Sequence, residues 1–160
     1  MPLPSDRKPI TPEKALLRLE ERCARSEMCE HEALERMARW GLPASDAIQV
    51  LRSLTSRKFI DNERFAAAFV RDKYRFQRWG RRKIAYALAL KKIPRSIIGP
   101  AMEQIDDSEY REILSALIAA RARTLGEGAR TYEGRTKLFR MAASRGYESD
   151  LIAAELKRLV

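Results

Sequence analysis

Residues 61–93 read DNERFAAAFVRDKYRFQRWGRRKIAYALALKKI, and this stretch decides the fold. Asp61 has the type of side chain that caps a helix N-terminus, and phenylalanines at positions 65, 69 and 76 follow along one side of the predicted helix. Gly80 then marks a turn, and the basic residues after it begin a second helix. We therefore expect two helices joined by a short connection.

Helical spacing of apolar residues recurs outward from this stretch. A first helix is expected from about Thr11, and two more follow before Asp61. No alternating apolar run exceeds four residues, and there is no Asn-Gly or Asp-Gly turn. The chain is predicted to be all-α. The residues that mark the first three helices are Leu16, Leu19 and Cys23, then Ala33, Leu34, Met37 and Ala38, then Ala47, Ile48, Leu51 and Leu54.

An internal repeat appears when Gly41, Lys92 and Gly146 are placed in register. Gly41 and Gly146 suit the left-handed position that ends a helix, and Lys92 takes that position without being glycine. The aligned apolar positions are Ala33, Ile84 and Leu138; Met37, Leu88 and Ala142; Leu42, Ile93 and Tyr147; Ala47, Ile98 and Ile152; Leu51, Met102 and Leu156; and Leu54, Ile105 and Leu159.

The repeat predicts an array of three three-helix units over residues 12–60, 61–105 and 106–160, after a flexible, basic N-terminal arm over residues 1–11. Because each unit is too small to bury a core alone, we expect neighbours to pack into an elongated, gently curved array. Ser45, Ser96 and Ser149 are the predicted caps of the third helices. Pro100 is unfavourable in the third helix of the middle unit unless that helix starts late, and residues 126–134 are predicted to form a loop.

The charge is concentrated in the middle unit. Residues 61–105 hold eleven Lys or Arg and four Asp or Glu, a net of +7, whereas residues 12–60 and 106–160 each have a net charge of only +1. A dense basic patch indicates a polyanionic partner, and nucleic acid is the first candidate. A helix from Asp61 gives arginines 64, 71, 75 and 78 a broadly common side. Cations at positions 81–83 oppose the dipole of the next helix, which indicates a role outside helix stability.

Composition argues against several other classes. No apolar run approaches the roughly 18 residues of a membrane span, and the polar, proline-rich start lacks a secretory core, so a cytoplasmic protein without membrane association is expected. Cys23 and Cys29 are expected to be reduced thiols, and two cysteines with one histidine, His31, which we expect to be exposed, make no metal site. The chain has no phosphate-binding Gly-x-x-x-x-Gly-Lys loop, so no cofactor is predicted.

A nuclease is the enzymatic alternative, because Asp61 with Glu63, or Asp106 with Asp107, supplies paired carboxylates. Both pairs also stand where carboxylates begin helices, and no further ligands appear at suitable spacing. We therefore predict no catalytic residues. Phe65 and Phe69 are expected in the core. For Tyr74 and Trp79 we favour packing, with base stacking as the alternative.

The segment Phe59-Ile60-Asp61-Asn62-Glu63-Arg64-Phe65-Ala66 is similar to the "hydrophobic-Ile-Asp-Asp-x-x-Phe-Ala" segment of the RecX family of recombination regulators. Gly80 with Ile84 and Leu88 resembles the family's "Gly-x-x-x-Ile-x-x-x-Leu" segment, and Lys91-Lys92-Ile93 stands where its members have Lys-Gly-Ile. The chain departs from the pattern at Asn62 for Asp, Arg81 for Pro and Lys92 for Gly. The resemblance in sequence motifs covers residues 59–93, and the resemblance in architecture covers residues 12–160.

The resemblance implies a non-enzymatic, monomeric protein that binds RecA and lies in the groove of RecA–single-stranded DNA filaments. RecX-like proteins inhibit ATP hydrolysis by RecA, strand exchange and filament growth, in recombination, repair and the SOS response. The alternative is a helix-turn-helix module that binds single- or double-stranded DNA without RecA. For either role the predicted binding residues are Arg71, Lys73, Arg75, Arg78, Arg81, Arg82, Lys83, Lys91 and Lys92.

Overall fold

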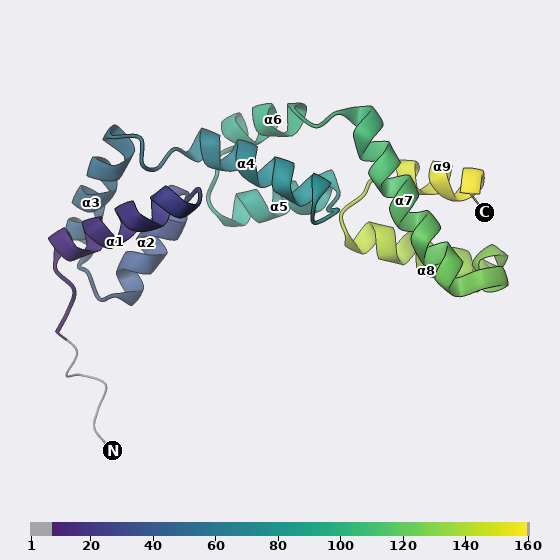
Figure 1. Ribbon diagram of the computed structural model, residues 1–160, viewed down its shortest axis with the longest axis horizontal. Coiled ribbons are helices and arrows are strands. Elements are labelled where there is room, and N and C mark those ends of the chain that lie inside the picture. The colour runs from purple at the N-terminus through teal and green to yellow at the C-terminus, as the bar shows by residue number, and fades with distance from the viewer. Residues whose placement is uncertain (1–7, 160) are drawn as a thin grey trace, which may run out of the picture. The chain divides into compact units, whose positions relative to one another are not determined.

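The computed structural model describes residues 8–159, and this part of the chain contains helices and no strand (Figure 1). The predicted all-α fold class is therefore confirmed. Residues 1–7 of the expected N-terminal arm lie outside the described residues. The elements are α1 (Pro12–Arg25), α2 (Glu30–Arg39), α3 (Ala44–Ser56), α4 (Asn62–Arg75), α5 (Arg81–Leu90), α6 (Arg95–Glu103), α7 (Asp107–Leu125), the 3₁₀ helix η2 (Gly126–Arg130), α8 (Tyr132–Ser144) and α9 (Ser149–Leu159).

The helices form two compact units. The first unit ends at Phe65, contains α1–α3, and has Leu19, Met37 and Leu54 in its fully buried core. The second unit begins at Ala66 and contains most of α4 and all of α5–α9. The division of the chain into three repeats stays a prediction.

Side-chain caps fix where several helices begin, as the sequence predicts. The Asp61 carboxylate accepts a hydrogen bond from the Arg64 amide (3.1 Å) at the start of α4, and Asp106 accepts one from the Glu109 amide (2.7 Å) at the start of α7. The Thr11 hydroxyl caps α1 in the same way. Each cap satisfies an amide that has no partner within its own helix.

The three aligned turns have the same backbone structure. Gly41, Lys92 and Gly146 have left-handed φ angles of 79°, 61° and 96°, so the predicted turn position is confirmed, including its one non-glycine member. In each turn the next residue is apolar and donates its amide to a carbonyl in the last helical turn, which is the Schellman arrangement. These bonds join Leu42 to Met37 (3.0 Å), Ile93 to Leu88 (3.2 Å) and Tyr147 to Ala142 (3.3 Å).

The predicted caps of the third helices are wrong by one or two residues. Pro43 and Pro94 occupy the N-cap positions of α3 and α6, so the serines that follow them at positions 45 and 96 lie inside the first turn. Proline suits a helix start because its φ is fixed and it has no amide to satisfy. Ser149 is the first residue of α9 instead of its cap. Pro100 lies within α6, which does not start late.

Two further expectations are wrong. The stretch from Gly126 to Gly134 is not a loop, since it forms η2 and the first turn of α8. A β-carbon on the buried Gly134 would lie 1.8 Å from the Gly128 carbonyl oxygen, so the glycine allows a close backbone approach. Phe76 does not belong to the apolar side of α4, because that helix ends at Arg75 and Phe76 is 76% exposed.

Candidate nucleic-acid interface

The nine predicted binding residues all lie in the second unit, on the last turns of α4, the connection to α5, and both ends of α5. We call them the basic cluster. They differ in what their side chains contact, and these contacts separate the cations that hold the fold from those that face solvent.

Arg81 is fixed inside the unit. Its guanidinium ion-pairs with Glu148 (2.9 Å) and with Asp107, and it lies 4.0 Å from the centre of the Tyr110 ring. Burial disfavours its charge, but the hydrogen bond and charge of Glu148 outweigh burial and raise the pKa of Arg81. The Arg81 amide also donates to the Tyr110 hydroxyl (2.9 Å). A cation at this helix start is therefore explained by partners that sequence spacing does not reveal.

The Tyr110 hydroxyl links the same elements. It accepts the bond from the Arg81 amide and donates to Glu148 at 2.5 Å, while the side chain is fully buried. Burial, and then the bond to Glu148, raises the pKa of Tyr110. Helices α5 and α7 and the start of α9 are thus joined around one hydroxyl.

Arg75 is also engaged. Its Nε donates to Glu109 (2.9 Å), and the buried Tyr74 donates its hydroxyl to the same carboxylate (3.2 Å). The packing interpretation of Tyr74 is confirmed, since a ring that is 1% exposed offers no face to a base.

Lys73 and Lys83 stand over the ring of Trp79, at 4.8 and 4.3 Å from its centre. Phe69 packs edge-on against the same indole, with ring centres 6.3 Å apart. Such cation–π contacts stabilise the arrangement and cover the ring. Packing is again favoured over base stacking for Trp79.

The remaining cations are more open. Arg71, Arg78, Arg82 and Lys92 are exposed, and none forms an ion pair with a carboxylate in the described residues, whereas Lys91 is half-buried and has a partner. The predicted stripe of four arginines is wrong at both ends. Arg64 pairs with Glu27 (2.7 Å) in the first unit, and Arg78 lies beyond α4 with a left-handed φ of 56°.

A further cation joins this surface from α8. Gly80 donates its amide to the Arg145 carbonyl (2.7 Å), and the Arg145 guanidinium donates to the Gln77 carbonyl (3.2 Å). A β-carbon on Gly80 would lie 2.2 Å from the Gly146 carbonyl carbon, so glycine permits this contact. Sequence reasoning missed Arg145 because it lies more than 50 residues beyond the last residue of the basic cluster, Lys92. Its position next to the aligned Gly146 could have indicated it.

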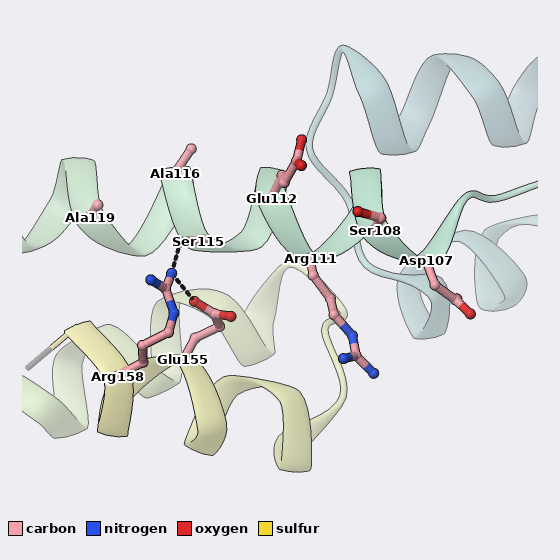
Figure 2. A pocket seen from close by; sticks show the side chains of 9 residues that line it. All are labelled: Asp107, Ser108, Arg111, Glu112, Ser115, Ala116, Ala119, Glu155 and Arg158. Carbon is pink, nitrogen blue, oxygen red and sulfur yellow. Dashed lines mark hydrogen bonds and ion pairs between the residues drawn. The ribbon is translucent and has the colours of Figure 1, made fainter.

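The carboxylates proposed for a nuclease have structural partners, since Asp61 caps α4 and Asp107 pairs with Arg81. A hollow of about 650 Å³ lies between α7 and α9. Figure 2 shows Arg158 there, bonded to Ser115 (2.5 Å) and Glu155 (2.8 Å). The lining contains three acids and two arginines, and the hydroxyl of Ser115 accepts a bond from an arginine and has no base beside it to activate it.

No group of three or more metal-ligating side chains occurs within residues 8–159. Cys23 is half-buried and Cys29 is buried, and neither is in a disulfide within the described residues. Burial raises the pKa of Cys23. His31 is half-buried beside Glu35 (3.1 Å) and not exposed as expected. None of the helices in the described part of the chain has the length and apolar content needed to cross a bilayer.

Residues 61–102, which include the whole basic cluster, match the model of the second three-helix domain of RecX. The chain is 26% identical over 131 residues to the regulatory protein RecX of Clostridium perfringens (strain 13 / Type A), covering 81% of this chain and 61% of that protein. The matched domain and the curated relatives support a RecX family protein. RecX of Clostridium botulinum (strain Eklund 17B / Type B) is 30% identical over 108 residues, which are 67% of this chain and 50% of that one.

Solved structures agree with this family at the level of the fold. A crystal structure of RecX from Lactobacillus salivarius has a TM-score of 0.78 at 16% identity, covering 92% of this chain and 96% of that one. A second RecX regulatory protein has the same TM-score at 20% identity, covering 91% of this chain and 73% of that one. The chain spans about 60% of the length of the first curated RecX relatives that it matches.

Two of the three departures from the RecX pattern form hydrogen bonds in the structure. The Asn62 side-chain oxygen accepts a hydrogen bond from the Glu30 amide (3.0 Å) at the start of α2. Arg81, where the RecX pattern has proline, donates its amide to the Tyr110 hydroxyl, a bond for which proline has no hydrogen. Lys92 adopts the left-handed turn despite its side chain.

Proposed function

We propose that this chain is a regulator that binds RecA and RecA–single-stranded DNA filaments in the filament groove and inhibits ATP hydrolysis by RecA, strand exchange and filament growth. The role belongs to recombination, repair and the SOS response, and the chain acts as a cytoplasmic monomer without catalysis of its own. The observation that carries the proposal is the set of exposed, unpaired cations inside the segment that matches a RecX domain.

The alternative of a helix-turn-helix reader of duplex DNA has weaker support. The third helix of the basic segment, α6, would be the helix that enters the major groove. It contains one basic residue, Arg95, and its other polar side chains are Ser96 and Glu103. Most base-edge contacts come from arginine, lysine, asparagine and glutamine, and α6 has only Arg95 of these, so it is poorly suited to the task.

The test is a titration of DNA-stimulated ATP hydrolysis by RecA with this protein, at two salt concentrations. The variant Arg71→Glu/Arg78→Glu/Arg82→Glu is compared with the parent. Arg81 and Arg75 stay unchanged because they hold the fold through Glu148 and Glu109. We expect the parent to inhibit at substoichiometric amounts and the variant to lose at least about tenfold in potency, with unchanged helical circular dichroism.

The matched control is Arg22→Glu/Arg25→Glu/Arg52→Glu, which changes the net charge equally on exposed, unpaired positions of the first unit. It should inhibit like the parent. Equal potency of the cluster variant and the control would remove the assignment. Inhibition only at protein amounts that coat the DNA would indicate competition for the strand, and would favour the RecA-independent module.

A further inference from the structure

A second basic surface lies in the second unit, between α7 and α8. These helices pack against each other and enclose a groove of about 580 Å³. Four of its lining residues are cations and none is acidic. The lining residues are Leu117, Ala120, Arg121, Thr124, Lys137, Arg140, Met141 and Arg145.

The charge of this groove is not balanced by the fold. Arg121, Lys137 and Arg140 are exposed and form no ion pair with any carboxylate among residues 8–159. The hollow between α7 and α9 is different, because its lining residues include three acids and two arginines (Figure 2). Gathering like charges is unfavourable unless a ligand neutralises them, so the groove suits an anion with several charges.

Arg145 connects the groove to a segment that carries an exposed aromatic ring. It lines the groove, and its guanidinium donates to the carbonyl of Gln77 (3.2 Å), the residue next to Phe76 in the chain. Phe76 is 76% exposed, and its neighbours in the sequence include Arg75 and Arg78. Aromatic rings beside a basic groove are the platforms on which unpaired bases stack.

We propose that the α7–α8 groove binds the phosphates of single-stranded DNA, with Arg145 leading the strand to Phe76, on which a base stacks. The proposal goes beyond the regulation of RecA, because the groove lies outside the residues matched by the family model and needs no recombinase. An acidic protein surface would use the cations but would have no need of Phe76. Paired bases in a duplex would not reach the ring.

The groove is long enough for a short piece of strand. The lining residues of α7 run from Leu117 to Thr124, which at the helical rise is about 10 Å. The three cations that form no ion pair among residues 8–159 lie on both walls of this length, Arg121 on α7 and Lys137 and Arg140 on α8.

The test measures binding of fluorescein-labelled oligothymidylate to the full chain by anisotropy over a range of salt concentrations, without RecA. The variant is Arg121→Gln/Lys137→Gln/Arg140→Gln, and Arg145 is kept because it bonds to Gln77. We expect at least tenfold weaker binding, and a slope of log affinity against log salt that is smaller by about 2, at roughly 0.7 per phosphate contact. Phe76→Leu should weaken binding by about fivefold or more.

The control is Arg111→Gln/Arg123→Gln/Arg130→Gln, which removes the same charge from exposed positions of the same unit outside the groove. It should change the slope by much less. The proposal is overturned if the groove variant and the control behave alike, if a duplex of equal length binds as tightly as the strand, or if polyglutamate competes as well as oligothymidylate. Because RecA is absent, this result is independent of the outcome of the ATPase titration.

Discussion

The hydroxyl group of Tyr147 is expected to destabilise the fold. Its ring is 1% exposed and packs on Tyr110 with ring centres 5.2 Å apart, yet its hydroxyl is buried without a hydrogen-bond partner in the described structure. Leaving a buried hydroxyl unpaired costs about 1–3 kcal/mol. We therefore expect Tyr147→Phe to raise the free energy of unfolding by about 1 kcal/mol in urea denaturation.

The matched control is the same change at its neighbour. Tyr110→Phe deletes the acceptor of the Arg81 amide and the donor to Glu148, so both are left unpaired. It should lower the free energy of unfolding by about 1–3 kcal/mol. Equal effects of the two substitutions would contradict this account of the hydroxyls.

The buried hydroxyl of Tyr147 also predicts that the folded protein loses stability at alkaline pH. Burial raises the pKa of Tyr147 to about 12, whereas an unfolded tyrosine titrates near ~10. Between these values the folded chain keeps a proton that the unfolded chain has released, so the free energy of unfolding falls as pH rises. Urea denaturation at pH 9 and pH 11 should show a smaller fall for Tyr147→Phe than for the parent. An identical fall in the free energy of unfolding would mean that groups other than Tyr147 cause the loss of stability.

Of the three aligned turns, the one after α5 has a lysine at the left-handed position, where the other two have glycine. Lys92 has a φ of 61°, and a left-handed backbone costs an L-residue about 1 kcal/mol relative to glycine. Lys92→Gly should therefore raise the free energy of unfolding by about 0.5–1 kcal/mol.

The reciprocal change tests the same turn in the first unit. Gly41 has a φ of 79°, and a β-carbon there would meet no atom within 4 Å, so only the backbone penalty applies. Gly41→Lys should lower the free energy of unfolding by about 1 kcal/mol. If Lys92→Gly destabilises the protein, side-chain contacts of Lys92 outweigh its backbone strain.

These turns show what the sequence could predict about the elements. Left-handed turns and aspartate caps depend on residues within a few positions, so Gly41, Gly146 and Asp61 were readable locally. The start of α3 was missed because proline and serine both suit helix starts. Phe76 was misplaced because apolar spacing continues one residue beyond the end of α4, and only its 76% exposure separates it from the core.

Over the whole chain, the presence of a basic cluster could be predicted from the sequence, but which of its residues form ion pairs could not. Net charge is a sum over sequence, so the +7 of residues 61–105 required no structure. The partners of Arg81 are 26 and 67 residues away, and no local pattern indicates them. The α7–α8 groove was missed because its cations are spread over 25 residues on two helices, and the charge was summed over residues 106–160, where acids on both sides reduce the net to +1.

Because the chain forms two compact units, we expect a substitution in the second unit to destabilise that unit without affecting the first. Gly80 and Gly146 bring α5 and the α8–α9 turn into backbone contact within the second unit, through the bonds of Gly80 to Arg145 (2.7 Å) and Arg82 to Gly146 (3.0 Å). A β-carbon on Gly80 would overlap backbone atoms, which cannot move aside as a side chain can. Gly80→Ala should therefore destabilise the second unit by about 2–3 kcal/mol.

Each unit contains one tryptophan, so the effect can be located. In a Trp40→Phe background Trp79 reports on the second unit, and in a Trp79→Phe background Trp40 reports on the first. Gly80→Ala should move the urea midpoint reported by Trp79 and leave that of Trp40 in place, because the first unit has its own core. The control is Gly128→Ala, because a β-carbon on Gly128 would meet no atom within 4 Å. It should change the free energy of unfolding of either unit by less than about 1 kcal/mol. A common shift of both midpoints would mean that the two units unfold as one.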